Sequence, residues 1–220
     1  MALTKFNYNS FNVTPAASKA LAFNSGANGL TTATSGSMVL IKTLTASSDS
    51  TLEFVDGTDD VVLDNTYPTY VIKWINIHGS TDRFKFSFQG NAAGGSGYNE
   101  TMTTSWWQAY HDEADSNTAL TYVVGEDQAQ GTAFQSLSES SGTDNDQNVC
   151  GELWLFNPSS TTFVKHFLAK CHDHYYSDYK NHIFVAGYFN TTSAIDEIQL
   201  KLTTGNMDAG TIKLYGIKDS

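Results

Sequence analysis

The stretch RFKFSFQ, residues 83 to 89, indicates the fold class because its apolar side chains recur at every second position. Neighbouring side chains of an extended chain point to opposite faces, so Phe84, Phe86 and Phe88 share one face. The other face carries polar side chains, namely Arg83, Lys85, Ser87 and Gln89. This alternation predicts a half-buried β-strand.

A second stretch, TYVIKWINIHGS at residues 69 to 80, predicts a strand at the centre of a sheet. The alternation separates two sets of side chains: Val71, Lys73, Ile75 and Ile77 on one face, and Ile72, Trp74, Asn76 and His78 on the other. Both sets are largely apolar, which is typical of a strand that is covered on both faces.

The same period of two recurs along the chain, whereas helical periodicity is nearly absent. Further strands are predicted at MVLIKTLT (38–45), STLEFVD (50–56), LTYVVG (120–125), VCGELWLFN (149–157), TTFVKHFLAK (161–170), IFVAGYF (183–189), IDEIQLKLTT (195–204) and GTIKLYGI (210–217). SWWQAYHDE (105–113) is also predicted as a strand, with Trp106 and Trp107 on opposite faces. Turn-rich segments separate these strands, which predicts an all-β fold, an antiparallel β-sandwich of jelly-roll type.

The first 35 residues differ from the rest, because Asn, Ser, Ala, Thr and Gly predominate among isolated aromatic residues. Such a segment buries little apolar surface by itself. We expect residues 1–35 to form either an N-terminal arm that reaches a neighbouring subunit or an extra edge strand, and residues 36–220 to form the sandwich domain.

Charge and hydropathy exclude two classes of partner. The formal net charge is −11 and Arg83 is the only arginine, so the clustered cations that nucleic acids require are lacking. No apolar run approaches the roughly 20 residues of a membrane-spanning helix, so we expect no membrane insertion. The opening MALTKFNYNSFNVT has no basic start followed by an apolar run, and we expect synthesis and retention in a cytoplasm until assembly or release.

Potential metal ligands are densest in CHDHYYSDYKNH, residues 171 to 182. If the preceding strand continues into it, Cys171 lies on the apolar face, and His172 and His174 lie together on the other face. Two imidazoles do not make a site, because stable zinc sites use about three or four protein ligands. His182 and other groups would have to complete it, so we expect a Tyr-rich hairpin loop and no cofactor. Cys150 and Cys171 are expected to be free thiols.

Other acidic residues give weaker signals. Asp56, Asp59, Asp60 and Asp64 have oxygen ligands suited to calcium but lack the spacing of an EF-hand loop, so an acidic turn is expected. The carboxylates of Asp112 and Glu113, like those of Asp196 and Glu197, are adjacent in sequence and should point apart on a strand. No hydrolase, P-loop or dinucleotide motif is present. We therefore expect a protein without enzymatic activity, and keep a metal-dependent enzyme as a distant alternative.

Six aromatic residues are candidates for contact with a ligand or partner: Trp106, Trp107, Tyr110, Tyr175, Tyr176 and Tyr179. Flat Trp and Tyr rings stack on sugars, but subunit contacts are enriched in the same residue types. Residue type alone therefore leaves both a glycan and a protein open as the partner.

Several phrases resemble a family of virion structural proteins of tailed phages, notably marine ones. They are FQGNAAGGSGYNETMTT (88–104), DQAQGTAFQSL (127–137), LWLFNPSSTTFVKHF (153–167), GYFNTTSAIDEIQLKL (187–202) and GNMDAGTIKLYGIK (205–218). The resemblance covers roughly residues 65 to 218. It implies a jelly-roll-like component of the head, tail or fibre without enzymatic activity, located in the virion. It also implies that residues 171 to 182 form a loop.

On this basis we expect a homo-oligomer, with a trimer favoured and a pentamer as the alternative, that also contacts other virion proteins. The main alternative is a receptor-binding module that recognises a glycan on the host surface. The final strand fits an architectural role, because Gly216 allows a neighbouring segment to approach the backbone closely.

Overall fold

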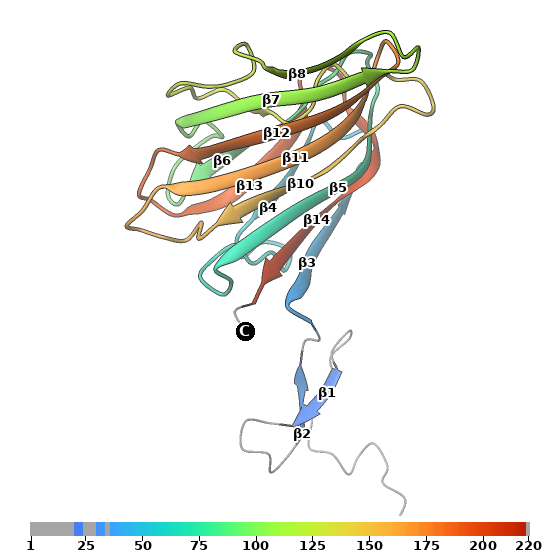
Figure 1. Cartoon of the computed structure of the whole chain (residues 1–220). Coiled ribbons are helices and arrows are strands. Elements are labelled where there is room, and N and C mark those ends of the chain that lie inside the picture. The colour runs from blue at the N-terminus through green and yellow to red at the C-terminus, as the bar shows by residue number, and fades with distance from the viewer. Residues whose placement is uncertain (1–19, 24–29, 34–35, 219–220) are drawn as a thin grey trace, which may run out of the picture.

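Two antiparallel sheets packed face to face make up most of the structure, a computed structural model that describes residues 20–23, 30–33 and 36–218 (Figure 1). The larger sheet has the strand order β3 (Met38–Thr45), β14 (Met207–Ile217), β5 (Thr69–Gly79), β10 (Val149–Phe156), β11 (Lys165–Tyr175), β12 (Tyr179–Phe189), β7 (Met102–Asp112) and β8 (Thr118–Tyr122). The smaller sheet has the order β4 (Thr51–Val55), β13 (Ile195–Leu202), β6 (Phe86–Ala92) and β9 (Gln135–Ser136). The predicted all-β sandwich is confirmed.

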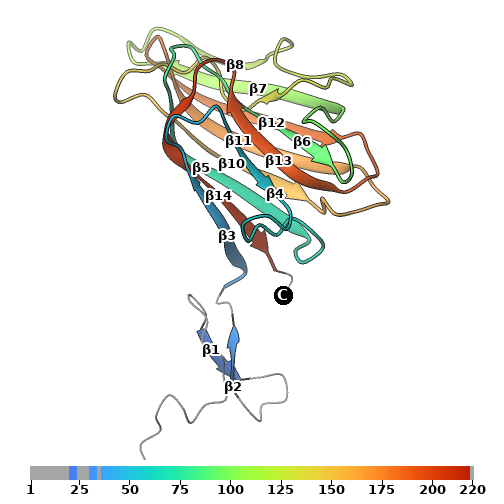
Figure 2. The same ribbon diagram turned by 180° about the vertical axis from the view of Figure 1, so that it is seen from behind.

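The topology is that of a jelly roll with additional strands. The partial orders β3-β14-β5-β10 and β4-β13-β6-β9 are those of two four-stranded jelly-roll sheets, between which the chain crosses repeatedly. The two hairpins β7–β8 and β11–β12 are additions that widen the larger sheet on one side. Figure 2 shows the larger sheet extending behind the smaller one, with β4 and β13 in front.

The stretch RFKFSFQ lies deeper than the alternation predicted. Phe84, Phe86 and Phe88 are buried in the core, as expected, but all seven residues of β6 are buried. The prediction of a half-buried strand was wrong because a later segment covers the second face. The side-chain amide of Gln89 donates hydrogen bonds to three backbone carbonyls there, those of Glu100, Thr132 and Ala133.

The strand β5 lies between β14 and β10, which confirms its predicted central position. Its alternation breaks at a bulge where Ile75 and Asn76 together lie opposite Cys150, and Asn76 has a φ of 55°. Ile77 consequently joins Trp74 in the core, whereas Ile75 is 43% exposed. The predicted grouping of these side chains is therefore wrong beyond the bulge.

The described part of the N-terminal segment is a separate small sheet. β1 (Ala20–Phe23) and β2 (Leu30–Ala33) pair with each other, and neither is hydrogen-bonded to a strand of the sandwich. The rest of the predicted arm or edge strand lies outside the described residues. In the part of the chain that the structure covers, no helix is long and apolar enough to cross a membrane.

Candidate functional site

CHDHYYSDYKNH forms a β-hairpin, which corrects the prediction of a loop. β11 and β12 pair in continuous register from Lys165 opposite Phe189 to Tyr175 opposite Tyr179, so only residues 176–178 form the turn. Tyrosines favour strands, and their cross-strand contacts extend the pairing into this segment. The alternation was predicted correctly, since Cys171 is fully buried and His172 is exposed on the opposite face.

The three candidate metal ligands do not converge. His172 and His182 are cross-strand neighbours whose rings stack with centroids 4.2 Å apart, but His174 Nε2 lies 3.4 Å from Glu113 Oε1. Partial desolvation of the stacked rings is the largest cause that lowers the pKa of both histidines, although His172 faces solvent; the charge of Lys180 lowers both further, and the charge of His172 also lowers the pKa of His182. Over the described residues, no group of three or more His, Cys, Asp or Glu side chains is arranged to hold a metal ion.

Trp106 and Trp107 point in opposite directions, as predicted, and neither is among the residues that line the pocket between β7 and the β11–β12 hairpin. Trp106 is fully buried in the core, where Nε1 donates a hydrogen bond to the Ser136 carbonyl. Its candidacy as an exposed contact residue was therefore wrong. Trp107 lies on the outer face and stacks on Phe184 with ring centroids 4.0 Å apart. Phe184 in turn packs on His182, so these outer rings contact one another through their flat faces.

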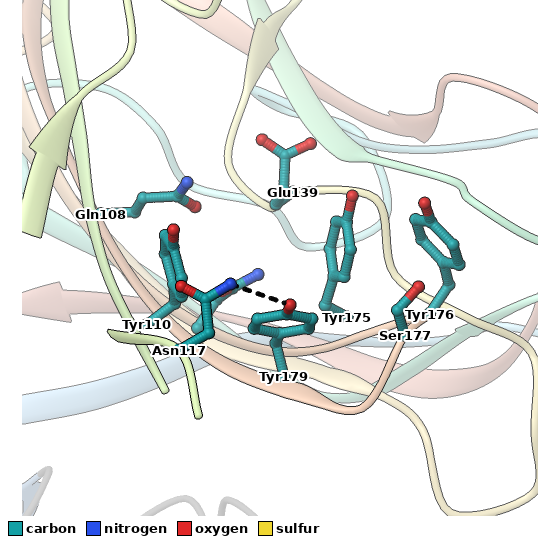
Figure 3. Close-up of a pocket in the computed structure, with 9 residues that line it drawn as sticks. Gln108, Tyr110, Asn117, Glu139, Tyr175, Tyr176, Ser177 and Tyr179 are labelled. Atoms are coloured by element: carbon teal, nitrogen blue, oxygen red, sulfur yellow. Dashed lines mark hydrogen bonds between the residues drawn. The ribbon is translucent and has the colours of Figure 1, made fainter. Parts of the chain in front are cut away.

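The other four candidate contact residues come together on the inner face of the larger sheet. Tyr110, Tyr175, Tyr176 and Tyr179 line a pocket of about 470 Å³ (Figure 3). Five polar residues complete the lining: Gln108, Asn117, Glu139, Ser177 and Asn181. The strands place these side chains, because alternate residues of β7 and of the β11–β12 hairpin project to this side.

Three of the tyrosines form a trough that we call the tyrosine cradle: Tyr110, Tyr175 and Tyr179. Tyr179 lies between the other two (Figure 3). Its ring centroid is 5.6 Å from that of Tyr110 and 5.7 Å from that of Tyr175, with interplanar angles of 76° and 89°. Asn117 Nδ2 donates a hydrogen bond to the Tyr179 hydroxyl at 3.2 Å. Mutual packing thus holds three rings in differing orientations around one space.

Glu139 reaches the pocket from the segment between β9 and β10. Its Oε1 lies 2.9 Å from Lys85 Nζ, which also contacts Glu126 Oε1 at 2.5 Å. Burial alone would lower the pKa of Lys85, but the hydrogen bonds with Glu126 and Glu139 raise it overall. The lysine therefore stays charged and fixes the position of the Glu139 carboxylate in the lining of the pocket.

Asp173 holds the segment that carries Glu139 against β11. Its Oδ2 accepts a hydrogen bond from the Glu139 N–H at 2.6 Å, and the next residue, Ser140, accepts one from the Tyr176 N–H at 3.1 Å. Asp173 is 5% exposed, lies cross-strand from Asn181, and has an Oδ1 without a hydrogen-bond partner among the described residues. Burial raises the pKa of this carboxyl to about 6.

The other acidic candidates have local roles. The Asp56 and Asp64 carboxylates accept hydrogen bonds from the backbone N–H groups of Leu63 and Thr66, at 2.8 and 2.7 Å, which closes the acidic turn on itself. The adjacent carboxylates of Asp112, the last residue of β7, and Glu113 point apart, as predicted: Asp112 is 8% exposed and caps the following turn, whereas the Glu113 side chain is 71% exposed. Cys150 and Cys171 are free thiols, as expected.

Five pocket residues were not predicted from the sequence. Gln108 and Asn181 could have been found, since each lies two positions from a candidate tyrosine and shares its face. Asn117, Glu139 and Ser177 come from turns and connecting segments, and no periodicity places these beside the tyrosines. No family model, curated protein or solved structure matches this chain.

Proposed function

We propose that this protein is a carbohydrate-binding component of a tailed-phage particle, with the jelly roll as scaffold and the tyrosine pocket as the glycan site. The observation that carries the proposal is the tyrosine cradle with amide and hydroxyl groups around it. Aromatic rings present flat apolar faces to the C–H groups of a sugar, and side-chain amides bond its hydroxyls.

The attribution to a phage particle rests on the sequence resemblance described above. The phrase GNMDAGTIKLYGIK supplies β14, which pairs with β3 and β5 inside the larger sheet. A Cβ atom at Gly216 would come within 2.3 Å of the Tyr67 ring, so the glycine allows this ring to pack directly against the backbone of β14. These are architectural features, and they support the role of a scaffold.

Binding without catalysis fits the pocket better than hydrolysis does. Glycosidases of the usual kind need two carboxyl groups that both reach the scissile bond. Among the described residues that line the pocket, Glu139 is the only one with a carboxylate, and it is paired with Lys85. Asp173 has the raised pKa of a general acid, but it is buried behind the lining and contacts the backbone of Glu139.

A glycan array followed by titration calorimetry tests this proposal. We expect saturable binding that Tyr179→Ala weakens about tenfold or more, since an aromatic contact is worth on the order of 1 kcal/mol and the hydrogen bond to Asn117 is lost with it. Trp107→Ala, on the opposite face of the same sheet, is the matched control and should leave the dissociation constant unchanged. Absence of saturable binding by the folded protein, or equal loss in both variants, would contradict the proposal.

A second candidate function, that of a homo-oligomeric structural subunit, is favoured by β8. This strand ends the larger sheet, and Leu120 and Tyr122 on it are 74% and 50% exposed, with Val124 beyond it at 76%. Apolar side chains at a free sheet edge favour pairing with another chain, here a further copy in a closed trimer or pentamer, or another virion protein. Light scattering should then show an oligomer that Leu120→Lys with Val124→Lys converts to a monomer. A wild-type monomer at high concentration would exclude this role.

A further inference from the structure

Tyrosine rings, whose faces carry partial negative charge, line the pocket on several sides. The faces of aromatic rings carry the negative part of the ring quadrupole and attract cations within about 6 Å of the ring centroid. Tyr110 and Tyr175 stand on either side of Tyr179 (Figure 3), so a group seated between them meets three rings. A ligand group with a positive charge gains from each of these contacts.

The polar groups of the lining add acceptors to this surface. Gln108 lines the pocket, and its Oε1 is buried without a hydrogen-bond partner within the described chain, so this oxygen gains a partner when the side chain turns toward a ligand donor. The Glu139 carboxylate is a second acceptor in the lining. An ammonium group offers three N–H donors and no acceptor, which matches these needs.

The cationic side chains near the pocket already have partners, so they do not compete with a cationic ligand for the tyrosine rings. Of the nine described residues that line the pocket, none is Lys, Arg or His, and Glu139 is the only charged one. Lys85 pairs with Glu126 and Glu139, and the Arg83 guanidinium lies 4.0 Å from the centroid of the Tyr176 ring. The net charge of −11 also draws cations toward the molecule.

We propose that the pocket binds an amino sugar in its protonated form, with the ammonium group between Tyr110 and Tyr175 and the Gln108 side chain turned to accept a hydrogen bond from it. The inference rests on the proposed glycan-binding function and names its ligand class. Lys85 is shared between two carboxylates, those of Glu126 and Glu139, so one negative charge remains, which a neutral sugar leaves without a counterpart and which repels an acidic sugar.

Three oligosaccharides with one backbone test the inference: β-1,4-linked tetramers of glucosamine, N-acetylglucosamine and glucose. They differ only in the group at C2 of each ring. Calorimetry at pH 6 should give a dissociation constant for the glucosamine tetramer about tenfold or more below those of the other two, because cation–π contacts in a partly desolvated site are worth roughly 1 to 2 kcal/mol.

Two variants separate seating in the pocket from general attraction to an acidic protein. Tyr179→Ala keeps the net charge, so a glucosamine tetramer that binds it as well as wild type is held non-specifically, which would overturn the inference. Tyr179→Phe keeps the ring and should keep most of the affinity. Gln108→Leu removes the unpartnered carbonyl and should weaken the glucosamine tetramer while leaving the thermal melting point within a few degrees.

The outcomes for the inference and for the proposed function are distinct. Equal affinity for the three tetramers, or binding of neutral array glycans only, overturns the inference and leaves glycan binding standing. Absence of binding to all three tetramers and to every array glycan overturns both.

Discussion

Replacing Asp173 with Asn should stabilise the protein at neutral and alkaline pH. The carboxyl has a pKa of about 6 in the folded state because it is buried, against 3.8 for the free group. Since the folded-state pKa is raised, the protonated form is favoured by folding: this contribution is full below pH 3.8 and is lost as the pH rises through 6. The difference of about 2 pKa units corresponds to about 3 kcal/mol of lost stability above pH 7.

The amide of Asp173→Asn cannot ionise, and its carbonyl oxygen can still accept the hydrogen bond from the Glu139 N–H. We therefore expect the variant to equal wild type near pH 4 and to exceed it by up to about 3 kcal/mol at pH 8. That corresponds to a melting temperature roughly 6 to 12 °C higher for a chain of this length. Urea denaturation at intervals from pH 4 to pH 8 measures the difference directly.

The control is Asp115→Asn, which removes a charge from a side chain that is 92% exposed. A stability difference between wild type and Asp173→Asn that does not grow with pH, or a variant that is less stable at pH 8, would refute the reasoning. Either result would mean that the buried carboxylate finds compensating partners when it ionises.

Three further predictions concern the sandwich. Trp106→Ala should cost about 3 to 5 kcal/mol of unfolding free energy by denaturant titration, because it opens a cavity in the core, whereas Trp107→Ala on the outer face should cost far less. Gly216→Ala should cost about 1 to 3 kcal/mol, since its Cβ would overlap the Tyr67 ring; an unchanged melting temperature would show that the ring can move away. Partial desolvation lowers the pKa of His172, so the stability that depends on its neutral form is present above pH 6.5 and lost as the pH falls through its folded pKa. His172→Gln should therefore reduce the fall of the melting temperature toward acidic pH, measured by circular dichroism. An unchanged fall would contradict the assignment.

The strand pattern was predictable because the face of each side chain depends on sequence neighbours alone. The errors arose where a distant segment intervened. In β5, two residues lie opposite the single residue Cys150 of β10, which forms a bulge and shifts the alternation. In β6, the second face is buried because residues between 100 and 133 cover it. Neither partner is visible from the local pattern.

The candidate site was partly predictable for the same reason. Aromatic type singled out the tyrosines, and the alternation correctly separated Trp106 from Trp107, but it could not say which of the two faces the core. Glu139 joins the pocket through hydrogen bonds of Asp173 and Tyr176 to a segment more than thirty residues earlier in the chain. Contacts of such sequence separation leave no periodic signal.

The two added hairpins have a consequence for how the proposed glycan site can change. Every pocket residue except Glu139 belongs to β7, β11, β12 or the turns that follow β7 and β11, whereas the eight jelly-roll strands supply none. The proposed glycan site and the eight-stranded scaffold are thus encoded in largely separate stretches of the gene. The pocket side chains within residues 108–117 and 175–181 could be exchanged to create new ligand preferences, while the core side chains of the same strands and the eight jelly-roll strands keep their sequence.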